Sequence, residues 1–116
     1  MCVTYEIIAD RAEIKIIGTC SREDLISGFK NLLSDQKLSK ATSILINVGE
    51  SETLPPSDVV EQIGHVIGAS KERFSGRVSV FVTQQVRYGL ARQLSVYLES
   101  YNLISMPFYE YQAAVA

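Results

Sequence analysis

Polar residues gather where a buried strand is expected to end and a helix to begin, in the stretch FVTQQVRYG. They are Thr83, Gln84, Gln85, Arg87 and Tyr88. The threonine and the glutamines offer neutral donors and acceptors, and the first free amides of a helix favour negative charge. Together with the Arg87 guanidinium, these groups could bind an anion or a polar ligand. The competing interpretation is a simple turn, with Arg87 solvated and Tyr88 packed over the sheet edge.

Ser57 is a second candidate, because it stands at an expected helix start after a strand. A phosphate on this serine would be stabilised by the helix terminus. The competing interpretation is a plain helix N-cap, a position that serine favours. Phosphorylation of Ser57 is therefore kept as a prediction beside the capping role.

Residues suited to catalysis are sparse. His65 is the only histidine, and no serine or cysteine stands next to it in the sequence to form a nucleophile–base pair. Glu50 and Glu52 could act as paired carboxylates in acid–base chemistry. A solvated turn in a loop rich in serine and proline explains these two glutamates better. We therefore expect that the protein is not an enzyme.

No cofactor or metal motif is recognisable. One histidine and two cysteines, Cys2 and Cys20, cannot complete a zinc set, and GASKERFSG lacks the GK[ST] ending of a phosphate-binding loop. The two cysteines could lie close in space, at the start of one strand and after the next, but we expect reduced thiols. The start MCVTYEII has no signal-peptide pattern, so a cytoplasmic location is expected.

The composition is that of an ordinary globular domain of 116 residues, with 47% hydrophobic and 21% charged residues. The net charge of −2 argues against a nucleic-acid binder, which needs a basic face to neutralise phosphates. The eleven lysines and arginines are scattered, with no cluster suited to an anionic membrane. No stretch is long and apolar enough to span a bilayer. We expect one domain over residues 1–116.

The alternation of residues from Val3 to Gly18 predicts a β-hairpin. If Asp10 and Arg11 form the loop, apolar residues meet on one face of the hairpin. On the other face Glu6 then lies opposite Lys15, which pairs opposite charges.

Three amphipathic helices are predicted, each with one apolar stripe. They lie within residues 19–35, 57–70 and 87–101. Ser21 is expected to cap the first helix, with Asp24 completing a variant of the capping box. In the second helix, Gly64 and Gly68 predict close packing of the backbone on the sheet.

Apolar runs at residues 44–48 and 77–83 predict strands that are covered on both faces, and residues 104–111 predict a last short strand. The order β-β-α-β-α-β-α-β implies parallel pairs after an antiparallel hairpin. We therefore predict an α/β fold with a mixed, mostly parallel sheet. Ligands of such sheets bind beyond the carboxyl ends of the strands. The loops expected to meet there are 19–21, 49–57 and 83–88.

This order, together with SREDLISGFKNLLSD, SILINVGE before PPSDVVEQIG, and FSGRVSVFVTQQVRYGLARQLSVYLES, resembles the SpoIIAA-like proteins, also described as STAS/SEC14-type domains. The resemblance covers nearly the whole chain and implies a small α/β fold with a mixed sheet. It implies two kinds of role. STAS domains are regulatory modules that bind protein partners, some of them phosphorylated on a serine at a helix start, and SEC14-type domains bind lipids in an apolar cleft. The Asp-Ser-Ser-Gly of the phosphorylated members is replaced here by GESETLPPSD.

We therefore predict a small, non-catalytic regulatory or ligand-binding module that binds a protein partner or a small ligand at the carboxyl ends of the parallel strands. The alternative is a SEC14-like carrier or sensor of a lipid or another apolar ligand. The third helix, rich in tyrosine and leucine, favours this alternative, because it could line a cleft beside Phe108 and Tyr109. The sequence also leaves a homodimer open.

Overall fold

The computed structural model describes residues 2–52, 55–83 and 85–108, and for residues 85–88 and 104 only the backbone. Within these residues the chain forms five strands, three α-helices and one short 3₁₀ helix. They are β1 (Val3–Ile8), β2 (Arg11–Gly18), α1 (Arg22–Leu33), β3 (Ser43–Ser51), α2 (Ser57–Ala69), η1 (Lys71–Arg73), β4 (Arg77–Phe81), α3 (Gln85–Glu99) and β5 (Ile104–Phe108).

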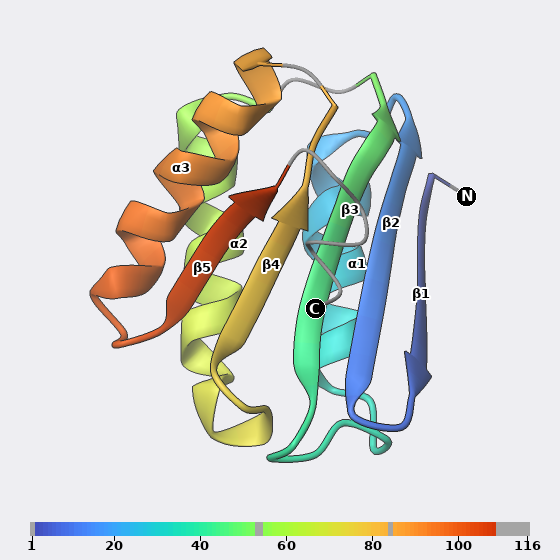
Figure 1. The fold of residues 1–116 in the computed structure, drawn as a ribbon. Coiled ribbons are helices and arrows are strands. Elements are labelled where there is room, and N and C mark those ends of the chain that lie inside the picture. Colours follow the sequence, from blue (N-terminus) through green and yellow to red (C-terminus); the bar gives the residue numbers. More distant parts are fainter. Residues whose placement is uncertain (1, 53–54, 84, 109–116) are drawn as a thin grey trace.

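The five strands form one sheet in the order β1-β2-β3-β4-β5, so that neighbours in the chain are neighbours in the sheet. β1 pairs with β2 in antiparallel fashion, and the other pairs are parallel. Each crossover moves one strand further in the same direction, and right-handed crossovers of this kind place their helices on one face. Figure 1 shows α1 and α2 behind the strands and α3 at the left, beside β5. The predicted mixed, mostly parallel α/β fold is confirmed.

The hydrophobic core lies between the helix layer and the sheet. Each helix presents its apolar stripe to the strands, and alternate strand residues point toward the helices. Phe29 of α1, Ile67 of α2 and Leu98 of α3 are at most 1% exposed, and Ile14 of β2 is fully buried beneath the helix layer. The core therefore holds the carboxyl ends of the strands in a fixed arrangement.

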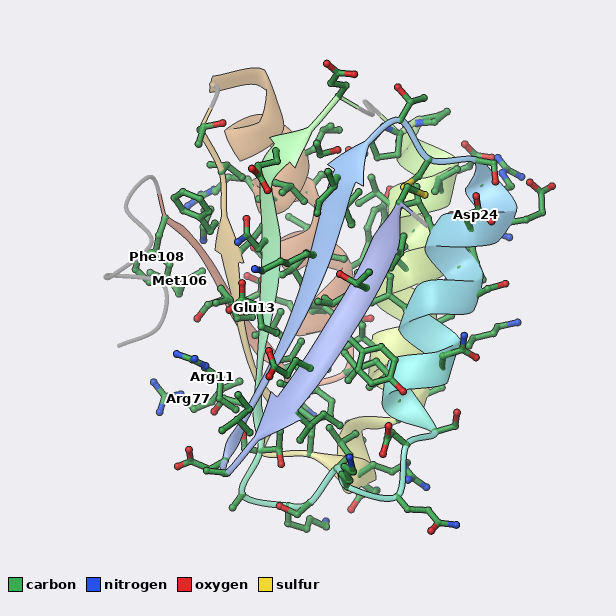
Figure 2. All side chains as sticks on the ribbon, turned by 90° about the vertical axis from the view of Figure 1, so that its right-hand side faces the viewer. Arg11, Glu13, Asp24, Arg77, Met106 and Phe108 are labelled. Atoms are coloured by element: carbon green, nitrogen blue, oxygen red, sulfur yellow. A yellow bond between two sulfur atoms is a disulfide. The ribbon has the colours of Figure 1, made fainter. Side chains whose placement is uncertain are left out.

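The face of the sheet away from the helices is mixed in character. Figure 2 shows the side chains that project from it: Arg11, Glu13, Arg77, Met106 and Phe108. Leu45, in the middle of β3, is 2% exposed although it points away from the helices. Ser79 and Phe81 on the neighbouring strand β4 are only half-buried. The prediction that the central strands are covered on both faces therefore holds for Leu45 and is wrong for β4.

The opening hairpin is two residues out of the predicted register. Ala9 and Asp10 form its turn, and Ala9 has a φ of 55°. A two-residue hairpin needs such positive φ values, and here an alanine adopts one in place of the expected loop at Asp10 and Arg11. As a result, Glu6 lies opposite Glu13 and not Lys15. The apolar face is unchanged, because a shift of two residues keeps every side chain on its own side.

The helix starts agree with the sequence in one case and differ in the other. Ser21 caps α1 as predicted, since its hydroxyl accepts a hydrogen bond from the Asp24 amide at 3.2 Å. Ser57, predicted as the cap of α2, is instead the first residue of that helix, and Pro56 occupies the cap position. Proline is compatible with a helix start because its ring fixes φ.

Gly64 of α2 contacts α3, and Gly68 contacts Tyr101 just after α3, not the sheet as predicted. A Cβ atom at Gly64 would lie 3.0 Å from the Cβ of Tyr97, and one at Gly68 would overlap the ring of Tyr101. The two glycines therefore allow the backbone of α2 to approach the side chains of Tyr97 and Tyr101 closely. The prediction of close backbone packing at these glycines is correct, but the predicted partner, the sheet, is wrong.

Cys2 and Cys20 form a disulfide, with their Cα atoms 5.7 Å apart, so the expectation of reduced thiols is wrong for this structure. The hairpin brings the two residues together. Ile17 donates its amide to the Cys2 carbonyl at 2.8 Å, which places Cys2 beside the end of β2. The disulfide ties the start of β1 to the segment that connects β2 with α1.

Candidate functional site

The carboxyl ends of β2, β3 and β4 lie at the same end of the sheet as the first residues of the three helices (Figure 1). The Glu52 amide donates to the Gly18 carbonyl at 2.7 Å, and the Thr83 hydroxyl donates to the Gly49 carbonyl at 3.2 Å. The ring of Phe81 lies against Gly49, where a Cβ atom would collide with it. These contacts hold the strand ends together as one platform.

An apolar pocket of about 80 Å³ lies beneath this platform, between the sheet and the helices. Its lining residues come from three strands, all three helices and the loop before α2: Ile16, Leu25, Phe29, Ile46, Val48, Ser51, Pro55, Val60, Ile63, Val80, Leu90, Ala91 and Leu94. An engineered apolar cavity of roughly 150 Å³ binds benzene. The pocket is about half that size and suits an aliphatic group of a few carbon atoms.

Charged and polar side chains surround the pocket at the helix starts. Arg22, the first residue of α1, forms an ion pair with Asp58 in the first turn of α2. Both side chains are largely exposed, so the pair joins the two helix ends but adds little to stability. Ser57 is exposed beside Asp58. The strand end thus combines an apolar centre with a polar margin.

Of the residues predicted to bind a ligand, only Thr83 has a described side chain. It is exposed after β4, at the expected end of the sheet, and its hydroxyl bonds to the Gly49 carbonyl. Gln84 and the side chains of Gln85, Arg87 and Tyr88 lie outside the described residues. The predicted strand-to-helix junction is present, because α3 begins at Gln85.

His65 has a structural contact on the surface of the molecule. Its Nδ1 forms a hydrogen bond with the Tyr101 hydroxyl at 2.5 Å, and the two rings meet edge to face. This contact links α2 to the residues after α3. Glu50 and Glu52 are exposed, as expected, but Glu50 lies within β3 and not in the predicted turn, because β3 continues to Ser51.

A second hollow, of about 350 Å³, runs between β1 and α1 and was not predicted. Figure 2 shows these two elements side by side, with Asp24 near the start of α1. We call it the β1–α1 groove, lined by Cys2, Val3, Thr4, Tyr5, Asp24, Ser27, Gly28 and Asn31. The adjacent small residues Ser27 and Gly28 within a helix were the one signal in the sequence that could have indicated a hollow beside it.

Tyr5, which lines this groove, is fixed by a hydrogen bond from its hydroxyl to the Asp35 carboxylate at 2.7 Å. This bond, with partial burial and the negative charge of Asp35, raises the pKa of Tyr5 above its ordinary value of 10.0. The pKa of Asp35 is lowered from its ordinary value, first by the Lys37 amide and next by the Tyr5 hydroxyl. The phenol and the carboxylate therefore remain a neutral donor and a charged acceptor near neutral pH.

In the part of the chain that the structure describes, no group of three or more His, Cys, Asp or Glu side chains is placed to hold a metal ion. Over the same residues, no helix combines the length and the apolar character needed to cross a membrane.

Comparison with known proteins identifies the fold. No protein-family model matches the chain, and no curated protein matches it. The chain is similar to the solved structure of an uncharacterized protein from the DUF3478 family, with a SpoIIAA-like fold, from Shewanella loihica PV-4. The match has a TM-score of 0.60 and covers 97% of this chain and 89% of the other, with 17% sequence identity. The chain has a SpoIIAA-like fold.

This likeness concerns architecture alone, because a fold can carry unrelated functions. In the SpoIIAA-like fold of this chain, the apolar pocket lies at the strand ends, where open α/β sheets place their ligands. The β1–α1 groove lies on the flank of the same fold.

Proposed function

We propose that the chain is a non-catalytic module that binds a protein partner through the carboxyl ends of its parallel strands. The observation that supports this proposal most directly is the apolar pocket of about 80 Å³ at that end. Protein interfaces owe much of their affinity to a few side chains of one partner that fill pockets of the other. An aliphatic side chain of the partner is the expected occupant, and a small ligand with such a group would bind in the same way.

The surroundings of the pocket also suit an interface. Arg22 and Asp58 form an exposed ion pair there, and Glu50 and Glu52 are exposed on the neighbouring strand end. Interfaces commonly have an apolar centre with a polar, solvent-accessible margin. This arrangement favours a protein partner, whose own polar groups would meet the margin while one side chain enters the pocket.

The alternative function, a carrier or sensor of a lipid, is favoured only by the apolar lining of the pocket. Pockets for drug-sized ligands occupy roughly 300–1,000 Å³, whereas this one measures about 80 Å³. A complete lipid chain would require the helices to move apart. An organic extract of protein purified from its own source distinguishes the two functions, because a carrier retains a stoichiometric lipid.

The first experiment asks whether the pocket accepts an apolar guest. Xenon is a suitable probe, because it enters dry apolar cavities. In NMR spectra of the xenon-saturated protein, we expect shifts of the Ile46 and Leu94 methyl signals, since both residues line the pocket. Ala91→Leu should fill the pocket and abolish these shifts. The matched control is Ala69→Leu, at an exposed alanine at the end of α2.

The second experiment connects the pocket to a partner. Proteins captured from an extract of the source cells by the wild-type chain and by Ala69→Leu should be absent with Ala91→Leu. A partner that binds all three proteins equally would show that the pocket is not the binding site. Xenon shifts that persist in Ala91→Leu would show that the probe binds elsewhere.

Ser57 is proposed as a phosphorylation site within the same module. It is exposed at the first position of α2, where the free amides favour a phosphate. Mass spectrometry of the protein from its source should show a phosphate-sized increment that maps to Ser57. If the increment is absent or maps to another residue, Ser57 is not the phosphorylation site.

A cytoplasmic location and a homodimer remain proposals as well. The Cys2–Cys20 disulfide is an observation against the cytoplasm, where thiols are kept reduced. Alkylation of intact cells before lysis measures the state of the two cysteines in place. Sedimentation of the purified protein measures the number of subunits.

A further inference from the structure

β1 is an edge strand, and its outer side carries free backbone groups. Ile17 donates its amide to the Cys2 carbonyl at 2.8 Å, which fixes the positions of the hydrogen-bonded pairs between β1 and β2. In an antiparallel pair these positions alternate, so the N–H and C=O groups of Val3, Tyr5 and Ile7 point away from β2. Within the described residues, no strand pairs with β1 on that side. This edge can accept a further strand.

The opposite edge of the sheet is less suited to pairing. Val82 donates its amide to the Phe108 carbonyl at 2.9 Å, and the same alternation turns the nitrogen of Pro107 outward from β5. Proline has no N–H to donate, and prolines at sheet edges prevent unwanted pairing. β1, with the sequence VTYEII, contains no proline and is rich in residues that favour strands. The free edge at β1 therefore lacks the protection that β5 has.

The β1–α1 groove would receive the side chains of an added strand. Alternate side chains of such a strand point toward the helix layer, and at this edge they would enter a hollow of about 350 Å³. Gly28 permits α1 to approach Val3, because a Cβ atom there would collide with the valine side chain. Ser27 and Asn31 add small polar groups along the helix wall. Backbone bonds would supply affinity and the groove would supply selectivity, as in other cases of strand addition.

The carboxylates nearest to the edge favour a basic segment, although Arg11 and Lys15 of β2 lie on the same face as Glu6. Asp24 lines the groove and is exposed, and no lysine or arginine is among the described lining residues. Glu6 is exposed on the other face of β1. Side chains on both faces of an added strand would thus lie near a carboxylate, and opposite charges on neighbouring strands stabilise pairing. A second copy of β1 would bring Glu6 and no lysine or arginine, so it fits less well.

We propose that the β1–α1 groove binds an extended, basic segment of a partner protein, which adds to the sheet as a strand beside β1. The segment donates and accepts backbone hydrogen bonds at Val3, Tyr5 and Ile7, and a lysine or arginine side chain reaches Asp24. This site is separate from the strand-end pocket and does not depend on the function proposed for that pocket.

The test begins with random linear peptides displayed on phage and selected against the disulfide-bonded protein. Enriched peptides should carry lysine or arginine among residues that favour strands. A synthetic copy of one such peptide should slow hydrogen exchange of the Val3, Tyr5 and Ile7 amides. N-methyl groups on alternate peptide residues provide the sharpest check: methylation on the side that faces β1 should abolish binding, and methylation on the other side should leave it intact.

Variants of the protein complete the test. Ser27→Trp should fill the groove and weaken binding of the peptide by at least about tenfold. Asp24→Asn should weaken binding by a smaller factor. Gln62→Trp, at an exposed position of α2, is the matched control and should have no effect. Peptides that bind Ser27→Trp as tightly as the wild type would overturn the proposal, as would a failure to enrich any peptide. A dimer whose β1 amides are already protected without peptide would assign the edge to a second copy instead.

Discussion

The hydrogen bond between Tyr5 and Asp35 joins a strand to the turn after α1 and contributes to the shifted pKa of both groups. Because the pKa of Asp35 is lowered in the folded state, its contribution to stability is present above the ordinary value of 3.8 and is lost as the pH falls through the lowered pKa. Because the pKa of Tyr5 is raised, its contribution is present below pH 10.0 and is lost as the pH rises through the raised pKa. The contact should therefore persist between these two limits.

Substitution of Tyr5 tests this coupling. In Tyr5→Phe the Asp35 carboxylate loses one donor but keeps the Lys37 amide, at 2.9 Å. Its pKa should rise part of the way toward 3.8, as measured by NMR titration of the carboxyl carbon. Asp35→Asn should conversely lower the pKa of Tyr5 toward 10.0, as measured by ultraviolet titration. An Asp35 pKa that is unchanged in Tyr5→Phe would show that the bond is absent in solution.

Ser105 on β5 gives a second prediction at the scale of one residue. Its hydroxyl oxygen is buried and has no hydrogen-bond partner among the described residues. A buried polar group without a partner costs stability, so Ser105→Ala should raise the free energy of unfolding by about 1 kcal/mol. Ser43→Ala is the comparison, because its hydroxyl lies 3.2 Å from that of Ser75. If urea denaturation shows Ser105→Ala to be less stable than wild type, the hydroxyl has a partner in solution.

Local chemistry allowed some single residues to be predicted from the sequence and not others. The Ser21 cap was predictable, because its partner Asp24 is three residues away. The bond between Tyr5 and Asp35 spans thirty positions and depends on how α1 packs against β1, which no local pattern reveals. The predicted role of Arg87 stays a prediction, since its side chain lies outside the described residues.

At the scale of elements, one glycine in α2 and one in α3 offer a matched pair of substitutions. Gly68→Ala should destabilise the protein by about 1–3 kcal/mol, because the new methyl group would overlap the Tyr101 ring. Gly89→Ala should stabilise it by about 0.5–1 kcal/mol, because Gly89 lies in α3 with nothing near the position of its Cβ. Urea denaturation of the two variants measures the sign of each change in the free energy of unfolding. A stabilising Gly68→Ala would mean that Tyr101 does not pack against α2.

Element order was easier to predict than the pairing between elements. The alternation of apolar strands with amphipathic helices was sufficient for the order. The predicted register of the first hairpin was wrong by two residues, because Ala9 adopts a positive φ, which is uncommon for alanine and is not indicated by the sequence. The glycine contacts of α2 were assigned to the wrong neighbour, since an amphipathic pattern does not tell a helix partner from a sheet partner.

At the scale of the whole molecule, the disulfide restricts the unfolded chain more than the folded one. Cys2 and Cys20 are 18 positions apart, and closing a loop of about this length is worth about 3 kcal/mol of unfolding free energy. Cys20→Ser should reduce the free energy of unfolding, measured by urea denaturation, by about that amount. Dithiothreitol should reduce the free energy of unfolding of the wild type to the same value. If the reductant leaves the wild type unchanged, the cysteines are not bonded in solution.

The element order already implies that all helices lie on one face of the sheet, although this prediction was not made from the sequence. Each parallel crossover advances by one strand, so a common handedness places every helix on one side. The pocket lies at the strand ends, where the sequence predicted a ligand site, but its size and the existence of the β1–α1 groove could not be predicted, because both are spaces left between elements. Their size depends on side chains from several segments, such as Leu25, Ile63 and Leu94 around the pocket.

The sequential order of the strands also has a consequence for how the chain is made. Every strand pairs with the one synthesised just before it, so no strand waits for a distant partner. Contacts between segments close in sequence form quickly, and domains can begin to fold during synthesis. The hairpin β1–β2 can form first, and each later helix and strand can then dock on the growing edge of the sheet. Growth from the ribosome would proceed away from β1, which leaves that first edge available from the earliest stage of folding.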